Sequence, residues 1–180
     1  MTSIDLLVAE HRVIEKVLDA FQEAARRYAA GGECDDVSAM LRFFQTYGDA
    51  AHHEKEEQVL FPALRRHGIE PDASVLGPLS AQHASCRALV RDLHRYLDEP
   101  DSERARRAFA ATTDEYAAML RLHIALEDAF FAEVVQDEVL SPQEDDALVD
   151  AMLARDEEAF REVAKAAFER SAAAWRGRHG

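Results

Sequence analysis

Apolar side chains recur at alternating steps of three and four residues along several long segments of the sequence. The first such series runs through Ile4, Leu7, His11, Ile14, Leu18, Phe21, Ala25 and Tyr28. This spacing places all its members on one face of a helix and is typical of helices that pack in a left-handed bundle. Only seven glycines and five prolines interrupt the 180 residues. The sequence therefore predicts long packed helices.

Four helices are expected within residues 1–140. The first runs from Thr2 to Gly31, and the second from about Asp36 to Gly68, with Pro62 expected to kink or end it near Phe61. The third covers residues 76–97, and the fourth begins near residues 101–102. The third helix repeats the first at an offset of 72 residues, and the fourth repeats the second at an offset of 70. We therefore expect an all-α fold, an up-down-up-down four-helix bundle made of two similar hairpins.

Residues 141–180 are expected to form a C-terminal helical extension. The stretch "SPQE" places Ser141 as N-cap, proline at the first helical position and Glu144 in a capping box. One additional helix is expected from there to about Trp175. Its apolar side could lie against the bundle or against a second copy of the chain, which would make a homodimer.

Charge and composition exclude several classes of partner. The net charge of 21 − 35 = −14 argues against nucleic acid and against an anionic membrane surface. No apolar run is long enough to span a bilayer, and the first residues lack the features of a secretory signal. The two cysteines, Cys34 and Cys86, do not form a disulfide framework. We expect a cytoplasmic protein.

Four of the spaced positions are histidines: His11, His53, His83 and His123. Two residues on antiparallel helices lie at the same height when the turn is near their midpoint in the sequence. The midpoints of successive pairs are residues 32, 68 and 103, and each falls at or beside a predicted helix break. The four imidazoles are therefore expected to share one layer of the bundle.

Two of these histidines are followed at i+4 by a glutamate: His53 by Glu57, and His123 by Glu127. This spacing places both side chains on the same helix face. Four imidazoles and two carboxylates are too polar for a core unless they hold metal. Two carboxylates can bridge two cations, and these donors suit iron, or less often zinc or manganese. Asp128 is a fallback ligand.

The neighbouring residues are assigned from the same helical periodicity. His52 is rotated by about 100° from His53 and is expected at most behind the ligands. Lys55 and Glu56 are expected to face outward. Leu60 and Phe61 are expected to form a dry wall next to the metal layer.

Four motifs together resemble the hemerythrin-like, HHE cation-binding family: "AEHRVIEKVL", "HHEKEEQVLFP", "QHASCRALV" and "HIALED". The resemblance covers residues 5–140. It implies a four-helix bundle with a non-heme, oxo- or hydroxo-bridged pair of iron ions. By position, the ligands that it implies are His11, His53, Glu57, His83, His123 and Glu127.

Two details distinguish this sequence within the resemblance. Oxygen-carrying members have a further histidine four residues after the one that matches His83, where this chain has Arg87. The word "HEKEE" also resembles the His-Glu-x-x-Glu pattern of the F-box iron-sensing hemerythrin domain, which implies Glu54 as a further ligand.

These observations predict a di-iron protein that binds or senses a small ligand: O₂, NO or peroxide. Two alternatives remain open, a di-iron oxidoreductase that decomposes peroxide and a regulatory module whose C-terminal helix reports iron occupancy to a partner. The ferritin-like di-iron class is disfavoured because none of the four histidines has an acidic residue three positions before it. A zinc hydrolase is disfavoured because the sequence has no HExxH motif.

Overall fold

The computed structural model describes residues 1–33, 35–99, 102–161 and 165–179, with side chains as far as Trp175. These residues form helices joined by short turns, and the described part of the chain contains no strand. The all-α prediction is therefore confirmed. No helix among the described residues is both long enough and apolar enough to cross a membrane.

The first helix, α1, spans Ser3–Ala29 and begins as the sequence predicts. Thr2 is its N-cap, and a capping box joins Thr2 to Asp5. The helix ends before Gly31, whose φ of +99° is a left-handed conformation that glycine adopts readily.

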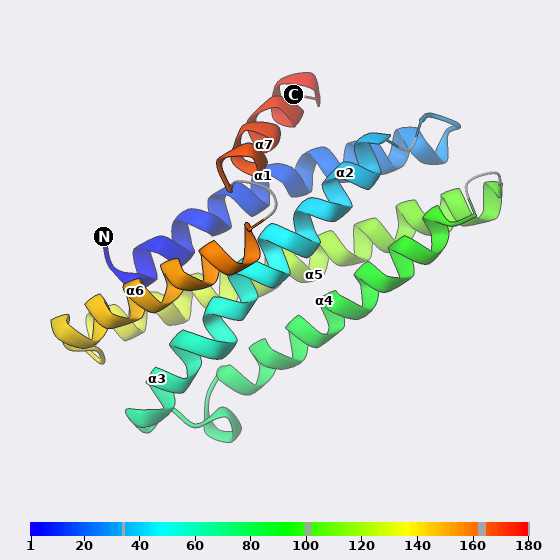
Figure 1. Cartoon of the computed structure of the whole chain (residues 1–180). Coiled ribbons are helices and arrows are strands. Elements are labelled where there is room, and N and C mark those ends of the chain that lie inside the picture. The colour runs from blue at the N-terminus through cyan, green and yellow to red at the C-terminus, as the bar shows by residue number, and fades with distance from the viewer. Residues whose placement is uncertain (34, 100–101, 162–164, 180) are drawn as a thin grey trace.

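The second segment is one continuous helical rod that changes its winding along its length (Figure 1). It consists of α2 (Asp35–Phe43), η1 (Phe44–His53), η2 (Glu56–Leu60) and α3 (Phe61–Arg66). The segments η1 and η2 are π-helical, with i→i+5 hydrogen bonding in wider turns. The sequence predicted that Pro62 kinks or ends the helix near Phe61; the helix does not end there, because the rod continues to Arg66. Pro62 lies at the start of α3, where the winding returns from π to α.

Two further long helices complete the bundle. A short 3₁₀ turn, η3 (Pro71–Ala73), leads into α4 (Leu76–Leu97), and Ser102 caps α5 (Glu103–Gln136). Asp101 and Cys34 lie outside the described residues, and Cys86 is a buried free thiol. Helix α5 packs against α1 and α4, and the rod packs against α1 and α4 as well. The four segments thus enclose a common interior (Figure 1).

The C-terminal extension forms two helices, so the prediction of a single helix to Trp175 is wrong. Helix α6 spans Pro142–Ala159 and has the predicted capping box, and α7 spans Lys165–His179. Helix α6 ends at Ala159 and is followed by Phe160, whose buried ring packs against Tyr47 and Phe168. Helix α6 packs on α1 and on the π-helical part of the rod, while α7 packs on α1 (Figure 1).

The interior consists of two apolar clusters. One lies around Phe21, Phe44 and Phe109, and the other around Leu7, Phe61 and Phe131. Between the two clusters lies a layer of buried polar side chains, which is the candidate functional site.

Candidate metal centre

The polar layer brings five imidazoles and two carboxylates together in the middle of the bundle. Its members are almost entirely shielded from solvent, with at most 3 % exposure: His11, His52, His53, Glu56, His83, His123 and Glu127. They come from α1, the rod, α4 and α5. Burial of so many polar groups is unfavourable unless each finds a partner.

Two groups of four side chains within this layer have the geometry of metal sites. His11, His52, Glu56 and Glu127 form the first group, and His83 and His123 with the same two glutamates form the second. In each group the potential ligand atoms all lie within 4.8 Å of one another. Glu56 and Glu127 belong to both groups, so the two candidate positions share their carboxylates. A third such group consists of His53, His83 and His123.

The distances place both carboxylates between the imidazoles. An oxygen of Glu127 lies 3.2 Å from His11 Nε2 and 3.0 Å from His123 Nε2. Glu56 lies 3.3 Å from His52 Nε2 through one oxygen and 3.3 Å from His83 Nε2 through the other. Each carboxylate thus spans the space between the two candidate positions.

The atoms that face this space lack hydrogen-bond partners within the described part of the chain. They are the Nε2 atoms of His11, His52 and His53 and both carboxylate oxygens of Glu56 and Glu127. The Nε2 atoms of His83 and His123 face each other at 3.1 Å. Nitrogen and oxygen atoms that converge without partners are a donor set for a metal cation, so the residues present fit a bound metal.

Each imidazole is held from behind by an oxygen atom near its Nδ1. The five pairs are His11 with Asp128 at 2.8 Å, His52 with Glu10 at 3.0 Å, His53 with Asp49 at 3.3 Å, His83 with Glu57 at 2.7 Å and His123 with Gln82 at 3.1 Å. A carboxylate or an amide oxygen accepts a hydrogen bond, so Nδ1 is the donor and Nε2 is the nitrogen that remains to face a metal. This is the usual support of a metal-binding histidine.

The carboxylates favour positive charge at the centre of the layer. Burial alone would lower the pKa of His11, but the nearby carboxylates of Asp128, Glu127 and Glu56 raise it to about 9. For His83, burial likewise acts to lower the pKa, and Glu56, Glu57 and Glu127 raise it to about 9. The pKa of His53 lies well below its ordinary value, because of burial and the neighbouring His83.

The structure brings together five of the seven residues predicted as metal ligands. His11, His53, His83, His123 and Glu127 all belong to the groups described above. The other two predicted ligands, Glu54 and Glu57, lie outside these groups. Glu57 instead binds His83 Nδ1 and the guanidinium of Arg87, at 2.7 and 2.9 Å. Arg87 also binds Asp49 at 2.7 Å, so its charge is compensated beside the layer.

Sequence reasoning missed His52 and Glu56 as members of the layer. Lys55 and Glu56 were expected to face outward, yet both are fully buried, so that prediction is wrong. His52 and Glu56 have the same i+4 spacing as His53 and Glu57, so the sequence contains a signal for either pair. The predicted dry wall is confirmed, since Leu60 and Phe61 are buried and Phe61 stacks on His83.

Comparison with known families supports cation binding by this part of the chain. The sequence model of the hemerythrin HHE cation-binding domain matches residues 2–134. The chain belongs to this family. The matched hemerythrin HHE domain contains α1, the rod and α4 and nearly all of α5, and hence every member of the polar layer. Helices α6 and α7 lie C-terminal to the matched residues and outside them. A comparison with curated proteins found no match.

Proposed function

We propose that the four long segments form an up-down-up-down bundle that holds two metal ions bridged by Glu56 and Glu127. The observation that supports this proposal is that the two four-residue groups share these carboxylates. His11 and His52 would hold one ion, and His83 and His123 would hold the other. Two carboxylates offset part of the charge of two cations, which a buried site requires.

Iron is the metal that we propose. The converging donors are imidazole nitrogens and carboxylate oxygens, a set that suits iron, with zinc and manganese as competitors. When bound, iron would supply a reducible centre with coordination positions left open for a small ligand.

The small ligand that we propose is O₂, NO or peroxide. A cavity of about 250 Å³ reaches the layer at His53 and is lined by Phe44, Cys86, Val90, Tyr116 and Arg87, among others. Its walls also include the polar side chains of Gln45, Asp49 and Arg91, and it is large enough for a ligand of two to four atoms. Arg87 stands at this cavity, where oxygen carriers of the family have their additional histidine. We therefore favour a sensing role over reversible oxygen transport.

Metal analysis of protein produced with ample iron is the first test. We expect about two iron ions per chain, as a carboxylate-bridged pair requires. Stoichiometric zinc without iron would contradict the proposal.

NO and hydrogen peroxide should then be added separately to the reduced protein under anaerobic conditions. A change in the optical spectrum with consumption of no more than one equivalent of the reagent per metal centre supports sensing. Continued loss of peroxide over many equivalents would favour the oxidoreductase alternative.

A further inference from the structure

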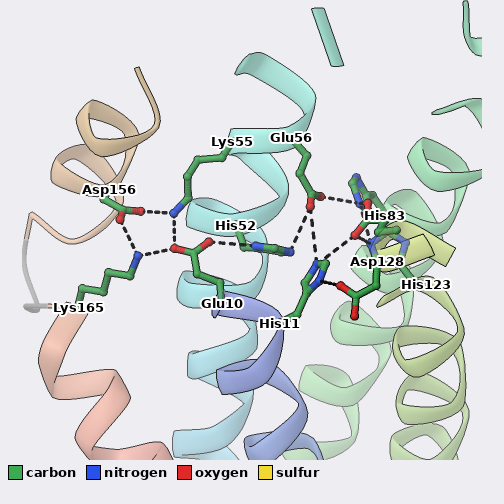
Figure 2. Close-up of polar contacts among 11 residues, drawn as sticks. Glu10, His11, His52, Lys55, Glu56, His83, His123, Asp128, Asp156 and Lys165 are labelled. Carbon is green, nitrogen blue, oxygen red and sulfur yellow. Dashed lines mark hydrogen bonds and ion pairs between the residues drawn. The ribbon is translucent and has the colours of Figure 1, made fainter. Parts of the chain in front are cut away.

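A second set of buried charges lies beside the metal layer, on the side covered by α6 and α7. It consists of Glu10, Lys55, Asp156 and Lys165, which we call the lysine network (Figure 2). The ammonium of Lys55, which has no exposed surface, lies 2.5 Å from an oxygen of Glu10 and 2.5 Å from one of Asp156. Lys165 contacts the same Glu10 oxygen and lies 2.6 Å from Asp156. Two positive and two negative charges therefore compensate each other in a largely buried position.

His52 joins the lysine network to the metal layer. Its Nδ1 lies 3.0 Å from the second oxygen of Glu10, and its Nε2 lies 3.3 Å from Glu56 (Figure 2). The carboxylate of Glu10 accepts hydrogen bonds from both ammonium groups through one oxygen and from His52 through the other. The proton is thereby held on Nδ1, and Nε2 is left free to bind a metal.

The lysine network crosses the boundary of the family match. Glu10 and Lys55 lie within residues 2–134, whereas Asp156 is on α6 and Lys165 is the first residue of α7. The chain has only three lysines among its 21 basic residues, and two of them are in this network. Each ammonium group contacts two carboxylates, Glu10 and Asp156. The third lysine, Lys16, is exposed on α1.

We propose that α6 and α7 act as a latch on the metal centre. Asp156 and Lys165 are positioning residues that act through Glu10 to hold His52 in the orientation that presents Nε2 to the metal. Occupancy of the centre and docking of α7 then favour each other, because coupling between two binding events is reciprocal. This inference rests on the proposed metal binding. It gives α6 and α7 a regulatory role in the binding of the metal.

The first test compares the affinity of full-length variants for ferrous iron. Lys165→Met removes the charge and keeps the apolar stem, and Lys16→Met is the matched control on an exposed lysine. Anaerobic competition with a chromophoric chelator should show binding about 10-fold or more weaker for Lys165→Met, the usual effect of losing a partner behind a ligand. The control should match the wild-type protein. Equal affinity of Lys165→Met and wild-type protein would overturn the latch.

The second test measures the reciprocal effect on wild-type protein, so it needs no variant that could lose stability. An amine-reactive reagent should modify Lys165 several-fold more slowly after iron loading, measured by mass spectrometry of the peptides. Lys16 is the internal control, and its rate should not change. The same Lys165 rate with and without iron would refute the coupling, even if Lys165 stabilises the fold. Wild-type protein that binds no iron would instead refute the proposed function, and the latch with it.

Discussion

At the scale of single residues, two adjacent glutamates have different roles. Glu56 is fully buried, and both of its oxygens face the metal layer without a hydrogen-bond partner among the described residues. The side chain of Glu57 is 21 % exposed and binds His83 and Arg87. Glu56 therefore lies where the proposed bridge between two ions requires a carboxylate, and Glu57 lies where it supports the His83 imidazole.

Substitution of these glutamates tests this assignment. Glu56→Gln should weaken metal binding by more than about 100-fold, because the loss of a ligand exceeds the 10- to 100-fold effect of losing a supporting partner. Glu57→Gln should weaken it by about 10-fold and keep the metal stoichiometry. Glu54→Gln is the control, since its side chain lies outside the groups, and its affinity should match that of the wild-type protein. Titration with ferrous iron measures the affinity of all three variants. A larger loss of affinity in Glu57→Gln than in Glu56→Gln would contradict the assignment.

At the scale of helices, the winding of the rod determines which residues enter the layer. Spacing of 3.6 residues per turn predicts His53 and Glu57 on the inner face, together with the seam positions before them. Each π-helical turn of η1 and η2 contains more residues than an α-helical turn. His52 and Glu56 therefore also lie on the inner face of the rod. Regular spacing does not encode this change of winding. Helix starts at Thr2, Ser102 and Ser141 could be predicted because their capping side chains are visible in the sequence.

The start of α6 gives a prediction about pH. Hydrogen bonds from the Ser141 side chain and backbone, and then from His67, lower the pKa of Glu144 from 4.5 to about 2. A lowered pKa in the folded state stabilises the fold above the unfolded value and loses this effect as pH falls through the folded value. Glu144→Ala should therefore melt below the wild-type protein at pH 7, and the difference should narrow between pH 4.5 and pH 2. Thermal melts of both metal-free proteins measure it, and a difference independent of pH would contradict this role of Glu144.

At the scale of the whole molecule, a polar layer divides the interior into two apolar clusters. The alternating three- and four-residue spacing predicted a helical bundle, and the positions of the helix breaks midway between the histidines predicted that four of them share a layer. The lysine network could not be predicted in the same way, because lysine is normally exposed and the partners of Lys55 include Asp156 on α6, far away in the sequence. The break between α6 and α7 was likewise missed, since it follows the burial of Phe160 against Tyr47.

Metal should stabilise the whole bundle. Without it, polar atoms of Glu56, Glu127 and three imidazoles face each other in the core with no hydrogen-bond partner in the described part of the chain. Binding to the folded state alone contributes about 4 kcal/mol when the free metal is at 1,000 times its dissociation constant. Calorimetry of the loaded protein and of protein stripped with a chelator should show a clearly higher melting temperature for the loaded form. Equal melting temperatures would mean that the layer does not depend on metal.

The central claim is that two cations share Glu56 and Glu127. Anomalous diffraction at the iron edge from crystals of the iron-loaded protein tests it most directly. We predict two separate peaks in the polar layer, one beside His11 and His52 and the other beside His83 and His123, with both carboxylates between them. A single peak, or two peaks bridged by Glu54 or Glu57 in place of Glu56, would contradict this account.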